Sequence, residues 1–181
     1  MLNIKYSLNK ENDQFLETIK STIGKDIIET KTFCNDYQII VPSKKIFDVL
    51  TKLHGNSYFA FDQLIDITAI DYPEKSTRFE VVYLLLSTIT NQRLTVKIYV
   101  NEGELVQSSV SIFKSANWSE REIWDMFGIF FSGHPDLRRL LTDYGFEGHP
   151  LRKDFPLTGR FQVKYDTCLL YTSDAADDKC S

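Results

Sequence analysis

Two histidines of this sequence, His134 and His149, lie in identical Gly-His-Pro triplets fifteen positions apart. Histidine nitrogens ligate zinc and related metals, so a shared metal centre is the first chemistry to consider. No HxH or HExxH pattern and no nearby cysteine supplies the further ligands. The proline after each histidine favours extended or turn backbone, which excludes a shared helical face. The pattern favours structural histidines that bond to backbone or a carboxylate, with a free-standing metal-dependent enzyme as the alternative.

Three carboxylates, Glu120, Glu122 and Asp125, lie close together and could perform general acid–base chemistry. That chemistry would need a pocket and raised pKa values. Ser119 and Glu122 instead have the S-x-x-E spacing of a helix capping box. Glu120 and Asp125 suit the positive end of a short helix. No GxSxG, GxGxxG or GxxxxGK[ST] motif is present. We therefore predict no catalytic residue, no bound cofactor and no metal in this chain.

The basic residues change type along the chain. Up to Lys114 there are eleven lysines and two arginines, whereas Ser115–Arg160 contains one lysine and five arginines. Five of the eight glycines and three of the five prolines lie between Gly128 and Gly159. Arginine stacks on aromatic rings and tolerates partial burial, and protein interfaces are enriched in arginine and depleted in lysine. We therefore expect the final third to be ordered by a protein partner.

Charge argues against nucleic acid as that partner. The net charge is −4, and Ser119–Arg160 contains six positive and seven negative side chains. Phosphate binding depends on clustered positive charge, whereas mixed charge suits an interface between proteins. From the charged, histidine and aromatic residues of this part of the chain, we predict these interface residues: Glu120, Arg121, Glu122, Trp124, Phe127, His134, Arg138, Arg139, His149, Arg152, Lys153, Asp154 and Phe155.

Composition bounds the remaining possibilities. A length of 181 residues suggests one domain with an appendage. Three cysteines without a CxxC pair argue against a disulfide framework and favour reduced thiols. No apolar run reaches the roughly 18 residues of a membrane helix. The N-terminal residues resemble neither a secretory signal nor an import peptide, so we expect the protein to work in the compartment where it is made.

Periodicity predicts an α+β fold with a mixed or antiparallel sheet, helices on one face, and an extended C-terminal segment. We expect an α+β body over 1–115, a short capped helix and partner-docking segment over 116–166, and an unassigned tail over 167–181. The expected helices are Asn9–Asp26, Ser43–Gly55 (capped by Ser43, with an apolar stripe of Ile46, Phe47, Leu50 and Leu53) and Asn117–Gly128. The expected strands are Tyr37–Pro42, Gln63–Pro73, Arg78–Thr88 and Arg93–Val100, the last two as a hairpin, with a short strand in Glu104–Phe113.

The third expected helix has the most specific boundary signals. Ser119 and Glu122 form the predicted capping box, and Trp118 and Ile123 have the spacing of a hydrophobic staple. Gly128 is expected to end the helix. Such a short helix is marginal in water by itself, so its defined ends indicate that its placement matters.

Two long stretches resemble the thirty-kilodalton subunit family of respiratory complex I. "EREIWDMFGIFFSGHPDLRRLL", Glu120–Leu141, is similar to the family signature, and "TDYGFEGHPLRKDFPL", Thr142–Leu157, is similar to the segment that follows it. "ITAIDYP", Ile67–Pro73, and "ANWSERE", Ala116–Glu122, agree with the mitochondrially encoded form of the family in order and spacing. Thr167–Ser181 departs from the family pattern, and we assign no function to it.

The resemblance implies a peripheral-arm subunit of the complex that carries electrons from NADH to ubiquinone and pumps protons. Its partners would be the larger quinone-site subunit, of forty-nine kilodaltons in the family nomenclature, and the subunit that holds the terminal iron–sulfur cluster. It would bind no flavin, cluster or quinone itself, because these lie in partner subunits. It would sit on the matrix side of the mitochondrial inner membrane and be attached only through the complex. A component of a related membrane-bound hydrogenase or plastid dehydrogenase is the alternative within the family.

Overall fold

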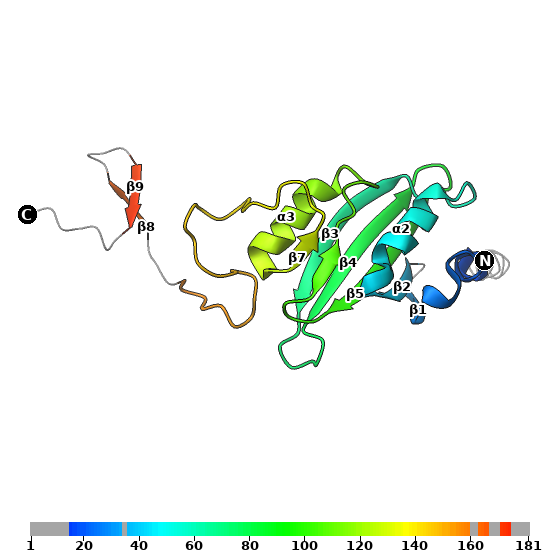
Figure 1. Ribbon diagram of the computed structural model, residues 1–181, viewed down its shortest axis with the longest axis horizontal. Helices are drawn as coiled ribbons and strands as arrows, with labels where there is room; N and C mark the ends of the chain where they lie inside the picture. Colours follow the sequence, from blue (N-terminus) through cyan, green and yellow to red (C-terminus); the bar gives the residue numbers. More distant parts are fainter. Residues whose placement is uncertain (1–14, 34–35, 160–162, 167–170, 175–181) are drawn as a thin grey trace, which may run out of the picture.

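The computed structural model describes residues 15–33, 36–159, 163–166 and 171–174. Its centre is a five-stranded sheet in the order β1-β2-β5-β4-β3 (Figure 1). Strands β2 and β5 run parallel, and the other neighbours run antiparallel, so the predicted mixed sheet is confirmed. The strands are β1 (Glu29–Phe33), β2 (Asp36–Pro42), β3 (Gln63–Asp71), β4 (Phe79–Ser87) and β5 (Gln92–Val100).

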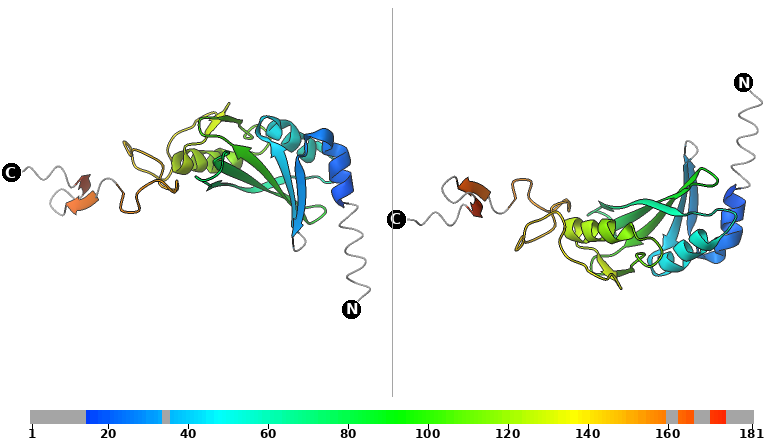
Figure 2. Two further views of the ribbon diagram at one scale, coloured as in Figure 1. Left: turned by 90° about the horizontal axis from the view of Figure 1, so that it is seen from below. Right: turned by 90° about the horizontal axis from the view of Figure 1, so that it is seen from above.

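Helices α2 (Ile46–Gly55) and α3 (Ala116–Phe127) cover the same face of this sheet (Figures 1 and 2). The first helix, described over residues 15–23, contributes Phe15, whose ring centroid lies 4.7 Å from that of Tyr37 on β2. Successive strand side chains point to opposite faces, so every second residue of each strand enters the core. The inward set includes Ile39, Val41, Ile67, Ala69, Val81, Tyr83, Leu94, Val96 and Ile98.

The β4–β5 hairpin is confirmed, with Phe79 opposite Val100 and Ser87 opposite Gln92. Strand β1 was not predicted, because "ETKTF" has no alternation of apolar and polar residues. It is an edge strand whose only sheet neighbour is β2, and its residues 29, 31 and 32 are exposed. An exposed edge strand buries little, so it leaves little hydrophobic pattern in the sequence.

The predicted start of the second helix is wrong in its detail. Ser43–Lys45 forms a 3-10 turn, and α2 begins at Ile46 without a side-chain cap. The Ser43 hydroxyl donates instead to the carboxylate of Glu104, which lies 61 positions away in the sequence. Ile46, Leu50 and Leu53 are buried as expected, whereas Phe47 is half-buried and Val49 completes the buried stripe.

The third helix, α3, begins at Ala116, one residue before the expected range and about one turn before the start that a cap at Ser119 implies. The turn before it supplies the acceptor for the first N–H group, since Ala116 N donates to Phe113 O at 3.1 Å. The predicted capping box and staple are therefore wrong: Ser119 lies inside the helix and donates to Asp66, and Trp118 is exposed. The predicted end is confirmed, because Gly128 has a left-handed φ of 75° and its N–H donates to Trp124 O.

Helix α3 packs on β3, and its residues Ile123, Met126 and Phe127 join the core of the body. The strands on either side of it in sequence, β6 (Leu105–Gln107) and β7 (Phe130–Ser132), pair as a two-stranded parallel ladder. Residues 133–159, called the C-terminal segment below, contain no helix or strand and run away from the sheet (Figure 1). Strands β8 (Val163–Asp166) and β9 (Tyr171–Asp174) form a separate ladder. Of the helices that the structure describes, none has the length and apolarity to cross a membrane.

Candidate functional site

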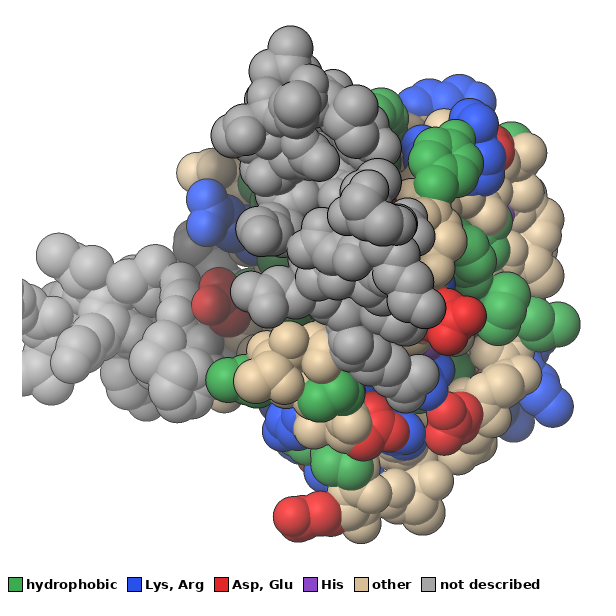
Figure 3. All heavy atoms as spheres, turned by 90° about the vertical axis from the view of Figure 1, so that its left-hand side faces the viewer, with side chains coloured by type: hydrophobic (Ala, Val, Ile, Leu, Met, Phe, Trp, Pro, Cys, Tyr) green, Lys and Arg blue, Asp and Glu red, His purple; other side chains and the backbone are tan. Residues whose placement is uncertain are grey.

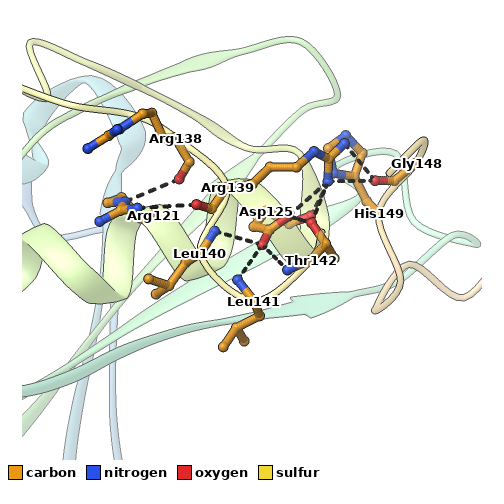
Figure 4. A network of polar contacts seen from close by, with 9 residues as sticks. All are labelled: Arg121, Asp125, Arg138, Arg139, Leu140, Leu141, Thr142, Gly148 and His149. Atoms are coloured by element: carbon orange, nitrogen blue, oxygen red, sulfur yellow. Dashed lines mark hydrogen bonds and ion pairs between the residues drawn. The ribbon is translucent and has the colours of Figure 1, made fainter. Parts of the chain in front are cut away.

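Asp125, in the last turn of α3, holds the C-terminal segment against the body. Its side chain is completely buried. One carboxylate oxygen accepts the three successive backbone N–H groups of residues 140–142 at 2.8–3.0 Å (Figure 4). The other accepts the Thr142 hydroxyl and the Arg139 guanidinium, whose Nη1 lies 2.8 Å away. Arg139 also donates to the carbonyl of Gly148, so a single carboxylate organises two stretches of the segment.

Asp125 is fully ionised at neutral pH. Burial by itself would raise the pKa of the Asp125 carboxyl, but the hydrogen bonds from Thr142, Leu141 and Leu140 outweigh burial and hold that pKa well below its ordinary value. We expected Asp125 at the positive end of its helix, and this is wrong, because α3 begins at Ala116 and Asp125 lies in its last turn. Backbone donors of the segment, rather than the helix terminus, stabilise the charge.

The segment also supplies donors to the free carbonyl groups at the C-terminal end of α3. The His149 ring Nδ1 lies 2.9 Å from Asp125 O and must donate, because a carbonyl only accepts. Leu151 N donates to Met126 O at 3.1 Å, and the Arg152 Nε donates to Phe127 O. The last carbonyls of a helix have no partner within the helix. Three of them are therefore satisfied by the C-terminal segment.

A second buried carboxylate, Asp71 at the end of β3, holds the segment further along. It binds both Arg78 Nε at 2.8 Å and Arg78 Nη2 at 3.0 Å, and it accepts the backbone N–H of Lys153 at 2.8 Å. The Arg78 hydrogen bonds, followed by the Lys153 N–H, hold the pKa of the Asp71 carboxyl below its ordinary value despite burial. Arg78 also pairs with Asp154 at 2.9 Å. The C-terminal segment is thus fastened at three places: to Asp125, to the last carbonyls of α3 and to Asp71.

Both histidines bond to backbone, as predicted. His134 Nε2 lies 3.1 Å from Asn117 O, and its Nδ1 accepts the N–H of Asp136 at 3.0 Å. His134 therefore reaches the beginning of α3, whereas His149 reaches its end. Within the part of the chain that the structure describes, no group of three histidine, cysteine or acidic residues is placed to hold a metal ion.

Comparison with known proteins identifies the family. The sequence profile described as respiratory-chain NADH dehydrogenase, 30 Kd subunit, matches residues 39–161. An NADH-quinone oxidoreductase subunit of Rhodospirillum rubrum is 52% identical over 148 residues, which cover 82% of this chain and 70% of the relative. The subunit of the same name from Brucella abortus is 51% identical, with 82% and 73% covered. This chain belongs to the 30 Kd subunit family of respiratory-chain NADH dehydrogenase.

Solved structures agree with membership of the 30 Kd subunit family. A trypsin-resistant fragment of Nqo5, residues 1–134, superposes with a TM-score of 0.58 at 28% identity, covering 69% of this chain and 98% of the fragment. A chain of the membrane-bound sulfane sulfur reductase, an archaeal respiratory membrane complex, superposes with a TM-score of 0.71 at 24% identity, covering 81% and 86%. The second likeness is one of fold alone.

The predicted interface residues of this family member fall into three groups. Arg121 donates to the carbonyls of Arg138 and Arg139, and Arg138 pairs with Asp136, so these arginines are engaged within the chain. Arg152 pairs with Glu102, and Asp154 pairs with Arg78. The remaining residues lie in different places. Glu120 is buried and accepts hydrogen bonds from Ser108 and Ser109, and Phe127 is in the core. Trp124 contacts Phe130 and Phe155 contacts Phe146, whereas Glu122 and the Lys153 side chain are exposed.

The contacts within the chain show what holds the C-terminal segment in place. That the predicted interface residues touch another subunit stays a prediction. Four large apolar or aromatic side chains of the segment face outward, Leu141, Tyr144, Leu151 and Leu157, beside exposed charged ones such as Arg138 and Lys153. Figure 3, which looks at this end of the molecule, shows hydrophobic side chains interspersed with basic and acidic ones. Sequence reasoning missed both this set and Asp71. The available signal for Asp71 was its position in β3, because a charged residue occupies an inward-facing place in an alternating strand.

The lowered pKa of His149 predicts a pH dependence of stability. Burial lowers the pKa of the His149 imidazole below its ordinary value of 6.5, and the neighbouring Arg152 and Arg139 add to that effect. The unfolded chain therefore binds the proton more readily, so stability is retained above about pH 6.5 and decreases as the pH falls below it. His149→Asn keeps a donor near the Nδ1 position without a titrating ring. We expect the wild-type free energy of unfolding to fall more than that of His149→Asn between pH 7.5 and 5.5; parallel curves would contradict this.

Proposed function

We propose that this chain is a non-catalytic structural subunit of the peripheral arm of proton-pumping NADH:ubiquinone oxidoreductase. The proposal rests on one observation: the C-terminal segment uses one set of groups to bind the body and exposes another set to solvent. Its backbone N–H groups, together with Arg139, His149 and Arg152, bind Asp125, Asp71 and the end of α3, whereas four of its large apolar side chains face outward. Exposed apolar side chains on a fixed segment are typical of a surface that another protein covers.

The proposed partners are the forty-nine-kilodalton quinone-site subunit and the subunit that holds the terminal iron–sulfur cluster. Family membership supports this, since the relatives are named as subunits of NADH-quinone oxidoreductase. The flavin and the clusters would lie in partner subunits, and this chain would contribute no catalytic residue. Its contribution is to fix the positions of its neighbours, which suits a segment whose irregular backbone is fastened to Asp125, to the end of α3 and to Asp71.

We further propose that the chain works on the matrix side of the mitochondrial inner membrane and reaches the membrane only through the complex. The resemblance of Ile67–Pro73 and Ala116–Glu122 to the mitochondrially encoded form supports this location. The relatives named above are bacterial, so the equivalent cytoplasmic face of a bacterial membrane is the other location for such a subunit. Fractionation of organelles, followed by detection of this chain in the inner-membrane fraction, tests the proposal.

The docking role predicts that outward-facing leucines of the segment are required for assembly. Leu141→Asp and Leu151→Asp each place a charge on the proposed contact surface, where burying an unpaired carboxylate costs several kcal/mol. We expect the fraction of each variant in the large complex to fall about tenfold or more on native gels of solubilised membranes. Ile89→Asp is the matched control, because Ile89 is an exposed aliphatic residue in the turn between β4 and β5.

Assembly of Leu141→Asp and Leu151→Asp at the wild-type level would contradict the docking role. Circular dichroism and urea unfolding of the purified variants separate this outcome from misfolding. Both side chains are more than half exposed, so the fold should tolerate the change.

A further inference from the structure

The parallel ladder of β6 and β7 turns two large apolar side chains to solvent. Leu105 lies directly opposite Phe130 in the register of the ladder, and the exposed fractions of the two residues are 64% and 48%. The next pair, Val106 and Phe131, points the other way and is buried in the core. The ladder lies on the helix side of the main sheet (Figures 1 and 2). Its inner face therefore packs on the body, and its outer face is open.

A parallel ladder with an open apolar face is unusual. Parallel sheets occur almost only where both faces are covered, and two short strands by themselves are at best marginally stable. Here each strand has three residues, and among the described residues the ladder has two strands. The buried pair of Val106 and Phe131 holds its inner face, whereas the described part of the chain leaves Leu105 and Phe130 largely in water. A second protein surface would complete this arrangement.

The open face of the ladder adjoins the C-terminal segment at two points. The ring centroid of Phe130 lies 6.3 Å from that of Trp124, and Trp124 lines a pocket together with residues of the loop 137–145. At the other point, Glu102 in the turn before β6 pairs with Arg152 of the segment at 2.6 Å. The exposed side chains of the ladder are therefore continuous with the surface on which the segment exposes its leucines.

The charges next to the ladder are compensated within the chain. Glu104, which comes directly before β6 and the exposed leucine, accepts the Ser43 hydroxyl, and Glu102 pairs with Arg152. A charged group of a partner would lose its water here without gaining a counter-charge. The complement to the ladder is therefore an uncharged, apolar surface.

The size of the open face indicates which protein covers it. A stable interface needs about 800 Å² from each partner, and two side chains supply only a small part of that area. The ladder alone would therefore not hold a second copy of this chain. It suffices as one end of a larger surface that includes the C-terminal segment.

We propose that the outer face of the β6–β7 ladder is covered by an uncharged apolar stretch of the same neighbouring subunit that covers Leu141 and Leu151. Leu105 and Phe130 are the anchors of this contact, and Trp124 packs against Phe130 from the side of the segment. The inference deepens the proposed docking function and rests on it. It extends the docking surface from the C-terminal segment onto the body of the protein.

Photo-crosslinking in the assembled complex tests the proposal. Phe130 and Tyr144 are replaced, in separate full-length chains, by p-benzoylphenylalanine, which keeps an aromatic ring, and mass spectrometry identifies the adducts. We expect both positions to give adducts with the same neighbouring subunit, and the adduct from position 130 to fall in an apolar stretch. From position 130, an adduct with lipid, with a second copy of this chain or with a different subunit, or no adduct at all, would overturn the proposal.

A substitution on β6 provides a second test. Leu105→Asp places a charge on the outer face of the ladder, where an unpaired carboxylate is costly to bury. We expect the fraction of this variant in the large complex to fall about tenfold on native gels. Ile28→Asp is the matched control, because Ile28 is 65% exposed and lies next to β1, at the far edge of the main sheet. Equal assembly of the two variants would overturn the proposal, and urea unfolding of the purified chains separates lost docking from misfolding.

The ladder contact and the docking function fail in different ways. If Leu141→Asp leaves the complex while Leu105→Asp assembles normally, the docking function holds and the ladder contact is lost. If the wild-type chain never migrates with a larger complex, the docking function is lost as well.

Discussion

Replacing Asp125 by asparagine is expected to lower the free energy of unfolding by about 3–5 kcal/mol and to release the C-terminal segment from α3. The wild-type carboxylate is completely buried, and its two oxygens accept three backbone N–H groups, the Thr142 hydroxyl and the Arg139 guanidinium. An asparagine side chain offers one oxygen and one NH₂ group. Whichever way it is turned, donors of the segment face a donor, and Arg139 loses its buried counter-charge.

The release has a site-specific readout. Hydrogen exchange of the amides of Leu140, Leu141 and Thr142 should become much faster in Asp125→Asn, because these amides donate to the carboxylate. Glu122→Gln makes the same chemical change at an exposed position of the same helix, and it should leave both exchange and stability unchanged within about 0.5 kcal/mol. Unchanged exchange in Asp125→Asn would show that other contacts hold residues 140–142.

The pH dependence of the Asp125 contribution to the free energy of unfolding follows from the direction of the Asp125 pKa shift. The folded-state pKa of Asp125 lies below the value in the unfolded chain, so the contribution is complete above the unfolded pKa of about 3.9. It is lost only as the pH falls through the folded value. The destabilisation of Asp125→Asn should therefore be constant between pH 5 and 8, in contrast to the His149 effect, which develops below about pH 6.5.

The longer helices and strands were predictable because the spacing of their hydrophobic residues specifies them. Beyond a bulge at Leu64–Asp66, Ile67 and Ala69 alternate into the core, and Ile46, Leu50 and Leu53 recur at helical spacing, so β3 and α2 have clear patterns in the sequence. The hairpin of β4 and β5 followed from two apolar runs with a short connection. These patterns arise from burial, and the elements that bury less, such as β1, left none.

Helix ends were less predictable, because a capping motif of a few neighbouring residues competes with contacts from residues outside that motif. The capping box at Ser119 has the right spacing, yet the turn ending at Phe113 supplies an acceptor earlier, and the helix begins at Ala116. Ser43 likewise binds Glu104 across 61 residues instead of capping α2. In both places a tertiary contact replaced the local one.

The sequence indicated where along the chain the candidate site lies, but not which hydrogen bonds and ion pairs its side chains form. The change from lysine to arginine and the cluster of glycine and proline fall in the part of the chain that contains the C-terminal segment, whereas its docking onto another subunit stays a prediction. Sequence could not show that Arg139 and Arg152 would turn inward, since their partners Asp125 and Glu102 lie 14 and 50 positions away. The backbone donors that surround Asp125 depend on loop geometry, which has no residue pattern at all.

Replacing Gly128 by alanine is the second substitution for which we expect a large effect. Gly128 has a φ of +75°, a conformation that costs about 1–2 kcal/mol for a residue with a Cβ. An added Cβ would also lie 2.5 Å from His149 Nε2 and 2.7 Å from Arg152 Nη2. Neither side chain moves away freely, because His149 is bonded to Asp125 O and Arg152 to Phe127 O. We expect Gly128→Ala to lower the free energy of unfolding by about 3–5 kcal/mol, combining backbone strain with these lost hydrogen bonds.

Gly133→Ala separates the two causes. Gly133 has a nearly identical φ of +79°, but among the described residues nothing lies within 4 Å of an added Cβ. It should therefore show the backbone strain alone, about 1–2 kcal/mol in urea unfolding. The difference between the two variants measures how strongly His149 and Arg152 fasten the segment to the end of α3. Equal destabilisation would mean that both side chains move aside without loss, and the segment would then depend on Asp125 and Asp71 alone.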